Sequence, residues 1–298
     1  MQSRSFLLCA AVAAAFALTG QAQEAKPQSN TKAKNAGPEP TEKKVYKQIG
    51  DTSLQLWIWK PEGWKASDKR GAIVFYHGGG WRGGNPSAFS RQSEALAKLG
   101  MVAISVQYRL ISQPGVTVPD CVKDARSAFR WVHSHAGELG IDPAKIAAGG
   151  GSAGGHLAAT LVTLDEINDE KDDKSIDIKP AALVLFNPVV KLDFRSAAES
   201  TAAQQEETLK VSPFHHLKAG HPPTMIFHGD ADTTVPIATV QAYAARVTEL
   251  GGSCEVVSFS GQQHAFFNKE PFVWDTLKKA EAFLEQHALV QKGTGLKN

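Results

Sequence analysis

The strongest chemical signal in the sequence is a serine surrounded by glycines. Gly150, Ser152 and Gly154 fit the pattern G-x-S-x-G, between a short apolar run and the helical spacing of residues 153–164. A serine at a sharp turn from strand to helix exposes its hydroxyl as a nucleophile, and small neighbours leave room for that turn. The same glycines also fit a loop that only turns a corner. A phosphate-binding P-loop is excluded, because the segment 149–155 contains no lysine.

A second glycine-rich loop carries groups that stabilise negative charge. Residues 77–81 read His-Gly-Gly-Gly-Trp and follow directly after an apolar run. Glycine lets the backbone approach a substrate closely, and N–H donors aimed at a developing oxyanion lower the barrier to acyl transfer. We predict an oxyanion hole made of the N–H groups of Gly79, Gly80 and Ala153. Trp81 is the candidate substrate contact, because it belongs to the same loop, although a tryptophan there also fits core or edge packing.

Acid and base candidates follow two later strand-like runs. Asp230 and Asp232 lie in one loop, and Asp232 is the better candidate because it lies farther along it, although an aspartate there also caps helices. Enzymes with such a G-x-S-x-G serine present the base after the acid in the chain, which leaves His264 and His287. His264 follows a predicted strand, whereas His287 lies late in a predicted helix. We therefore predict a triad of Ser152, Asp232 and His264.

The other histidines are given no chemical role. His77 precedes the serine in the chain and is expected to hold its own loop together. The remaining cluster lacks the i, i+4 spacing of a zinc pair, so no metal site is predicted. Its members are His215, His216, His221 and His228.

Strand and helix patterns alternate along the chain. Apolar runs typical of covered strands are followed by segments with apolar residues three and four apart, which are typical of helices. This alternation predicts an α/β fold with a mostly parallel sheet of about eight strands and helices on both faces. The expected strands are 54–59, 72–76, 101–106, 146–148, 181–186, 224–227 and 255–259, and the expected helices are 87–99, 120–133, 153–164, 237–250 and 271–287. In such sheets ligands bind at the carboxyl ends of the strands, where the motifs above fall.

The N-terminal residues are expected to direct export. Residues 6–18 form an uncharged apolar run, followed by small residues. The run is too short for the roughly 30 Å hydrocarbon core of a bilayer, so it predicts a signal peptide over residues 1–22. Residues 23–44 have the polar composition of a disordered tether, the catalytic domain is predicted over 45–290, and 291–298 form a C-terminal tail. We therefore expect a secreted or periplasmic protein without stable membrane insertion.

Composition and cysteine content give no indication of a nucleic-acid partner or of a disulfide. The 298 residues include 32 Lys and Arg against 30 Asp and Glu, a net charge of +2, which gives no argument for a nucleic-acid partner. A chain of this length buries a core without disulfides. Cys121 and Cys254 remain after cleavage, and nothing in their spacing suggests a pair, so unpaired thiols are expected. The sequence does not indicate the oligomeric state.

Taken together, these motifs resemble the α/β-hydrolase esterases and lipases that carry an HGGG loop, which include hormone-sensitive-lipase-like and carbohydrate-esterase-like enzymes. The matching segments are 77–81, 108–110, 142–143, 150–158, 228–236 and 261–267. The resemblance covers about residues 45–288. It implies the α/β-hydrolase fold, acyl transfer by a Ser–Asp–His triad, and neither a metal ion nor a diffusible cofactor.

Departures from the family pattern narrow the expected substrate. The long N-terminal cap of the lipase-like members is replaced by the tether, and the insertion at 190–210 is short and polar. A shallow site argues against long acyl chains, so a serine esterase for short-chain acyl esters is expected. Exported relatives are similar to enzymes that remove acetyl or feruloyl groups from plant polysaccharides. The expected partner is therefore a small-molecule or polysaccharide ester.

Two other functions remain open. Serine exopeptidases of the prolyl-oligopeptidase type share the serine motif and the block around Asp232, although the loop at 77–80 favours esters and no propeller-sized domain precedes the first predicted strand. The other alternative is a secreted carbohydrate-binding protein that has lost catalysis, although all three triad candidates are present. Binding without hydrolysis is the property that would distinguish it.

Overall fold

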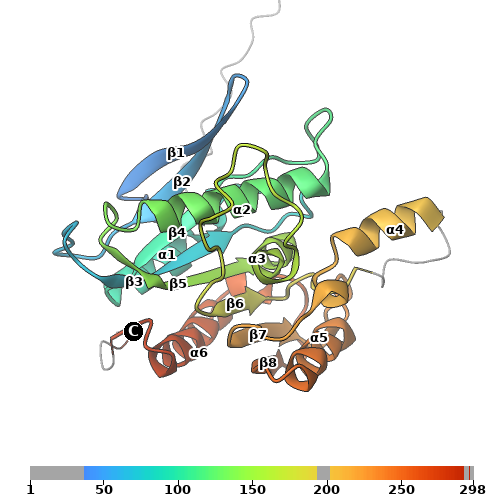
Figure 1. Ribbon diagram of the computed structural model, residues 1–298. Coiled ribbons are helices and arrows are strands. Elements are labelled where there is room, and N and C mark those ends of the chain that lie inside the picture. Colours follow the sequence, from blue (N-terminus) through green and yellow to red (C-terminus); the bar gives the residue numbers. More distant parts are fainter. Residues whose placement is uncertain (1–36, 193–201, 292–294, 296–298) are drawn as a thin grey trace, which may run out of the picture. The chain divides into compact units, whose positions relative to one another are not determined.

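A central sheet and its covering helices make up the computed structural model, which describes residues 37–192, 202–291 and 295 (Figure 1). The strands are β1 (Glu42–Ile49), β2 (Thr52–Trp59), β3 (Arg70–Tyr76), β4 (Val102–Val106), β5 (Ile141–Gly151), β6 (Leu183–Phe186), β7 (Thr224–Gly229) and β8 (Cys254–Phe259). The helices are α1 (Ser90–Lys98), α2 (Val118–Ser134), α3 (Ala153–Thr163), α4 (Ala202–Lys210), α5 (Ile237–Glu249) and α6 (Phe272–Gln286), with short 3₁₀ helices η2 (Pro86–Phe89), η3 (Pro213–His216) and η4 (Phe266–Asn268).

In the described part of the chain the sheet has eight strands in the order β1-β2-β4-β3-β5-β6-β7-β8. β1 pairs antiparallel with β2, and β2 pairs antiparallel with β4. All the later neighbours pair in parallel, because a helical connection returns the chain to the same edge each time. The predicted α/β fold with a mostly parallel sheet is confirmed.

Two apolar layers, one on each face of the sheet, form the core. Strand residues alternate between them: Val74 faces the layer built with α2, α3 and α5, whereas Ile73 and Phe75 face the layer built with α1 and α6. β3, β4, β6 and β7 are buried along almost their whole length, because helices cover both of their sides. This coverage explains the continuous apolar runs in the sequence.

The first strand corrects the predicted domain boundary. Residues 23–44 have the composition of a tether, yet β1 begins at Glu42, before the predicted domain start at residue 45. Its charged residues give it no apolar face by which a strand is recognised, and edge strands are commonly charged in this way. The Tyr46 hydroxyl donates to the carbonyl of Gln107 at 2.8 Å, which ties the β1–β2 hairpin to the end of β4.

Parts of the predicted domain organisation lie outside the described residues. These are the predicted signal peptide, 1–22, and the tether residues 23–36. Of the predicted tail, 291–298, only Gln291 and Gly295 are described. No helix among the described residues is both long and apolar enough to cross a bilayer.

The insertion between β6 and β7 is described in part. Residues 193–201 lie outside the described residues, and the end of the predicted insertion forms α4. No sequence pattern predicted α4, because its residues are mostly polar and show no apolar stripe. A hydrogen bond from the Phe214 N–H to the Val190 carbonyl, at 2.8 Å, holds the two ends of the insertion together.

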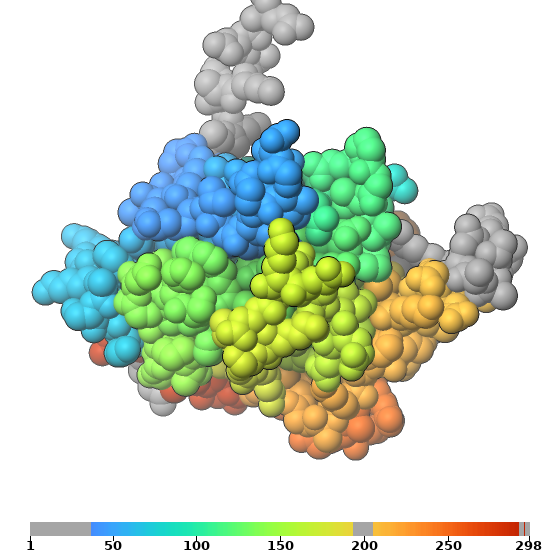
Figure 2. Space-filling view, turned by 45° about the horizontal axis from the view of Figure 1, so that its top comes forward, coloured from blue at the N-terminus to red at the C-terminus, as the bar shows by residue number. Residues whose placement is uncertain are grey.

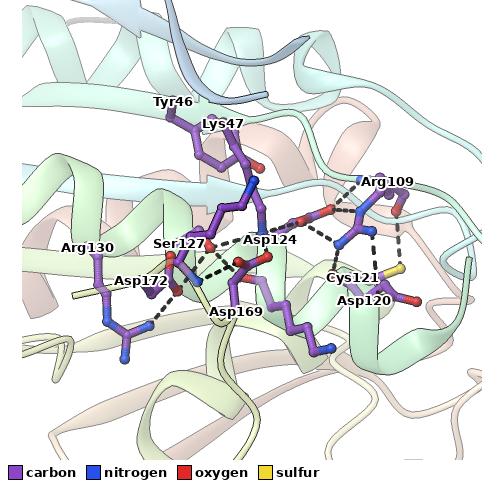
Figure 3. Close-up of polar contacts among 12 residues, drawn as sticks. Tyr46, Lys47, Arg109, Asp120, Cys121, Asp124, Ser127, Arg130, Asp169 and Asp172 are labelled. Atoms are coloured by element: carbon purple, nitrogen blue, oxygen red, sulfur yellow. Dashed lines mark hydrogen bonds and ion pairs between the residues drawn. The ribbon is translucent and has the colours of Figure 1, made fainter. Parts of the chain in front are cut away.

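A buried ion network fastens the hairpin to the rest of the fold (Figure 3). Asp124 on α2 is fully buried and accepts hydrogen bonds from Nε of Arg109 at 2.7 Å, while its other oxygen lies 2.8 Å from Nζ of Lys47 in β1. Lys47 also pairs with Asp169, in the segment after α3, at 2.7 Å. In Figure 2 this yellow-green segment meets the blue hairpin. The network therefore connects β1, α2 and the loop after β4.

The two cysteines among the described residues, Cys121 and Cys254, are free thiols, as predicted. Cys121 is buried in α2, and Cys254 is half-buried in β8. Burial raises the pKa of each thiol to about 12. Neither is therefore present as a nucleophilic thiolate at neutral pH.

Candidate active site

Ser152 occupies a strained turn between β5 and α3. Its backbone has φ 54° and ψ −118°, a conformation that residues other than glycine rarely adopt and that a nucleophile at this turn requires. Two hydrogen bonds from the end of β6 support it. The Ser152 N–H donates to the Phe186 carbonyl at 2.9 Å, and the Ser152 carbonyl accepts from the Val189 N–H at 3.2 Å. The serine is thus held by two neighbouring strands.

Close backbone packing explains the glycines of the serine motif. A Cβ on Gly150 would lie 2.5 Å from the backbone of Gly154, and a Cβ on Gly154 would overlap the Tyr76 carbonyl. A Cβ on Gly155 would lie 2.5 Å from the ring of Pro188. The N-terminus of α3 therefore lies directly against the ends of β3 and β6, where a larger residue does not fit.

His264 connects the serine with the predicted acid. Its Nε2 lies 2.9 Å from Oγ of Ser152, and its Nδ1 lies 2.7 Å from Oδ2 of Asp232. Both contacts are satisfied when Nδ1 carries the proton and donates it to the carboxylate, and Nε2 accepts the serine hydroxyl proton. The structure thus brings the three predicted triad residues together, from the loops after β5, β7 and β8.

The surroundings of Asp232 favour a charged carboxylate. Its Oδ1 accepts hydrogen bonds from the backbone N–H groups of Thr234 and Val235, each at 2.9 Å. Burial opposes ionisation, but the hydrogen bonds from His264 and from these two N–H groups outweigh it and lower the pKa of Asp232. The other candidate acid, Asp230, is exposed and accepts a hydrogen bond from the Gly261 N–H at 2.6 Å. The structure therefore distinguishes the two candidates.

The glycine-rich loop after β3 lies beside the serine. A Cβ on Gly78 would lie 3.4 Å from Cβ of Ser152. Gly79 has φ 117°, which only glycine adopts without strain. No hydrogen bond joins the N–H groups of Gly79, Gly80 or Ala153 to another described residue. These predicted oxyanion donors are therefore available to a substrate oxygen.

Tyr108 anchors this loop from the core side. Its hydroxyl donates to the His77 carbonyl at 2.7 Å, and its ring stacks on the His77 imidazole with 4.2 Å between centroids. Burial lowers the pKa of His77 to about 4, so the ring is neutral at neutral pH. This position agrees with the loop-holding role predicted for His77. Tyr108 directly precedes Arg109, which pairs with Asp124.

Trp81 differs from its predicted role as a substrate contact. The side chain is 5% exposed and packs in the core layer of α2 and α3. Its Nε1 donates to Nδ1 of His156 at 3.2 Å, and the two rings meet edge to face. The indole therefore has no exposed face on which a sugar ring could stack. Its residue type and its place in the motif do not reveal this inward direction.

Two buried polar residues beside the triad were not singled out from the sequence. His156 on α3 accepts from Trp81, and its Nε2 lies 2.7 Å from the Val211 carbonyl, where the insertion ends. Burial lowers the pKa of His156 to about 4, so this ring is also neutral. Asn187 directly follows β6 and contacts the His264 loop. Its place after a strand is the same signal that identified the triad residues.

The four clustered histidines, His215, His216, His221 and His228, have protein partners. His221 lies 2.7 Å from the Tyr243 hydroxyl, and Nε2 of His228 lies 2.8 Å from the Val235 carbonyl. Over the described ranges, no three His, Cys, Asp or Glu side chains are grouped so that they could hold a metal ion.

Known proteins provide two family matches and several similar sequences. Residues 56–247 match the BD-FAE family, and residues 207–292 match the Dienelactone hydrolase family. The probable carboxylic ester hydrolase LipM of Mycobacterium tuberculosis is 27% identical over 246 residues, 74% of this chain and 57% of that protein. The probable isoprenylcysteine alpha-carbonyl methylesterase ICMEL1 of Arabidopsis thaliana is 26% identical over 76% of this chain and 51% of that protein. The chain spans about half the length of these curated relatives.

Solved structures match over nearly their full length. The apo form of Thermogutta terrifontis esterase 2 is 44% identical, with a TM-score of 0.80 over 85% of this chain and 97% of that chain. The propionate-bound structure of that esterase matches with 44% identity and a TM-score of 0.79, over 84% of this chain and 95% of that chain. Because the BD-FAE match spans most of the chain and agrees with the fold, this protein belongs to that family, within the α/β-hydrolase esterases.

Proposed function

We propose that the protein is a serine carboxylesterase that acts on short-chain acyl esters. The observation that carries this proposal is the continuous series of hydrogen bonds from Asp232 through His264 to Ser152. A base in contact with a nucleophile, itself oriented by a buried acid, is the arrangement required for acyl transfer. Free N–H donors beside the serine suit the negative charge that forms on the carbonyl oxygen.

Each residue has a defined step in the proposed two-step reaction. His264 takes the proton of Ser152 as Oγ attacks the ester carbonyl, and the N–H groups of Gly79, Gly80 and Ala153 bind the oxyanion. His264 then protonates the leaving alcohol. A water molecule, activated by the same ring, attacks the acyl-enzyme and releases the acid. Asp232 keeps the imidazole in the required tautomer and stabilises its positive charge.

The preference for short acyl groups is supported by the similar structures. Thermogutta terrifontis esterase 2, 44% identical to this chain, has been solved with propionate bound, and a 43% identical form has been solved with butyrate bound. Acids of this size are the products of short acyl esters. We extend the same preference to this chain, because its fold matches those structures over most of their length.

Acetyl or feruloyl esters of polysaccharides are the natural substrates that we propose. The match to the BD-FAE family supports carbohydrate esters as substrates. The predicted signal peptide supports a secreted or periplasmic location. Expression of the full chain with a C-terminal tag tests export. A tagged product in the periplasm or medium that begins after residue 22 supports the proposal, whereas a cytoplasmic product that retains Met1 contradicts it.

Ester hydrolysis is tested with residues 37–298 and a series of p-nitrophenyl esters from acetyl to decanoyl, with Ser152→Ala as the control. Activity that decreases with acyl length and is lost in the variant supports the proposal. Comparison of acetylated and feruloylated xylan then distinguishes the polysaccharide substrates. Cleavage of aminoacyl anilides without ester hydrolysis would instead support an exopeptidase.

A further inference from the structure

One buried side chain joins the serine side of the site to the histidine side. Asn187 directly follows β6, is fully buried, and has φ 35°. Its N–H donates to the carbonyl of Phe227, in β7, at 2.7 Å. Phe186, which precedes Asn187, and Val189, two residues after it, both form hydrogen bonds with the backbone of Ser152. Asn187 is therefore placed at the point where the ends of three strands meet.

The Asn187 side chain reaches the loop that carries the base. Its Oδ1 accepts a hydrogen bond from the Ala265 N–H at 3.2 Å, which fixes the orientation of the amide. Nδ2 is consequently directed at Nε2 of His264, at a distance of 3.5 Å. Ala265 has φ 62°, an unfavourable conformation for alanine that requires support from its surroundings. The hydrogen bond that the Ala265 N–H donates to Asn187 gives that support immediately after His264.

We propose that Asn187 is a positioning residue of the triad, which holds the His264 loop so that Nε2 faces Oγ of Ser152. This inference deepens the proposed esterase function and rests on it. An amide suits the place because Nδ2 presents hydrogens and no lone pair to Nε2. The proton that His264 takes from Ser152 therefore cannot pass to Asn187, and the oxygen of the leaving alcohol remains as its acceptor.

Two variants separate this role from simple core filling. Asn187→Gly tolerates the positive φ but removes the whole side chain. Asn187→Asp keeps an acceptor for the Ala265 N–H and replaces the N–H donor near His264 with an oxygen. Tyr243→Phe is the matched control. It removes a different buried hydrogen bond, which joins the hydroxyl of Tyr243 on α5 to His221.

We expect Asn187→Gly to lower kcat on p-nitrophenyl acetate roughly 10- to 100-fold with little change in KM, since a small misplacement of the base affects the chemical step. Tyr243→Phe should retain kcat. Asn187→Asp should move the acid limb of kcat/KM to higher pH, because a carboxylate near Nε2 favours the protonated ring. Two other titratable groups, Asp232 and His228, face His264, and both variants leave them unchanged.

Three outcomes would overturn the proposal. One is a folded Asn187→Gly variant whose kcat stays within about twofold of the parent. Another is an equal loss of kcat in Tyr243→Phe. The third applies if Asn187→Gly does not fold: an Asn187→Asp variant whose pH profile and kcat are both unchanged would then overturn the proposal. Should the parent cleave no ester, the proposed function fails first, and the rate at which a fluorophosphonate labels Ser152 then tests Asn187 without turnover.

Discussion

The reactivity proposed for Ser152 depends on where one proton of His264 lies. Asp232 accepts a hydrogen bond from the Nδ1–H group, which keeps the proton on Nδ1 and leaves the lone pair of Nε2 for the serine hydroxyl. Asp232→Asn offers an N–H group to the same atom and favours the wrong tautomer. We expect kcat to fall by about 10⁴-fold with the fold retained. The measurement is the hydrolysis of p-nitrophenyl acetate, together with circular dichroism.

Asp230 supplies the matched control for that substitution. It lies in the same loop and is exposed, and its carboxylate bonds to the Gly261 N–H rather than to the base. Asp230→Asn keeps an acceptor for this bond, so kcat should stay close to that of the parent. Comparable losses in both variants would contradict the assignment of Asp232 as the triad acid.

His156 can be dissected in the same way, because its two ring nitrogens have different partners. Asn at this position keeps an acceptor near Trp81 but does not reach Val211, whereas Gln keeps a donor for Val211 but loses the acceptor for Trp81. Each variant should be destabilised by about 1–3 kcal/mol. Only His156→Gln should also lower kcat, since Trp81 belongs to the oxyanion loop. Urea unfolding and kcat for both variants check this, and an equal loss of kcat in the two would contradict it.

At the scale of elements, the ion network decides how firmly the β1–β2 hairpin is attached. Asp124 accepts from Arg109 and Lys47 in a fully buried position. Asp124→Ala removes the buried carboxylate that Arg109 and Lys47 share and leaves them only their more exposed partners, Asp120 and Asp169, so the free energy of unfolding should fall by about 3–5 kcal/mol. Lys98→Ala breaks only an exposed pair with Glu94 and should cost less than about 1 kcal/mol. Urea unfolding of both variants measures the difference, and similar losses would contradict it.

Elements with a strong apolar pattern were predicted from the sequence, and weakly patterned ones were not. The covered strands and five of the helices lie within a few residues of their expected places. β1 was missed because charged residues dominate an edge strand. The first half of β5 was missed because Asp142, Pro143 and Lys145 interrupt its apolar run, although Ile141 still pairs with Arg70 in β3.

The same division holds for the site. Chain order and the place of each motif after a strand identified the three triad residues, because parallel strands bring such loops to one edge. The inward direction of Trp81 and the bridging contact of Asn187 depend on which side chains meet across the core. A single sequence carries no record of those contacts, since they join residues far apart in the chain.

At the scale of the whole molecule, buried histidines link stability to pH. Burial lowers the pKa of His77 and His156 from 6.5 to about 4, and it also lowers the pKa of His221 and His228. Below pH 6.5 these histidines bind protons in the unfolded chain but stay neutral in the folded chain. The free energy of unfolding should therefore decrease as pH falls towards about 4. Above pH 6.5 these groups are neutral in both states and contribute no slope.

Urea unfolding at about pH 7, 6, 5 and 4.5 measures how the free energy of unfolding depends on pH. His156→Asn removes one titrating ring, so its stability should decrease with a shallower slope than that of the parent. A parent stability that stays constant between pH 6.5 and 4.5 would contradict the prediction.

The charged edge strand has a further consequence for concentrated solutions. β1 is the outermost strand of the described sheet, and its free backbone groups could pair with the same strand of another molecule. Lys43 and Lys44 lie exposed on it beside Val45, which is 50% exposed. Antiparallel contact between two copies would bring the ammonium groups of Lys43 close together, and only Lys44 has a carboxylate beside it, that of Glu42. Replacing both lysines with valine should therefore convert a repelling edge into an aggregating one, which light scattering would detect.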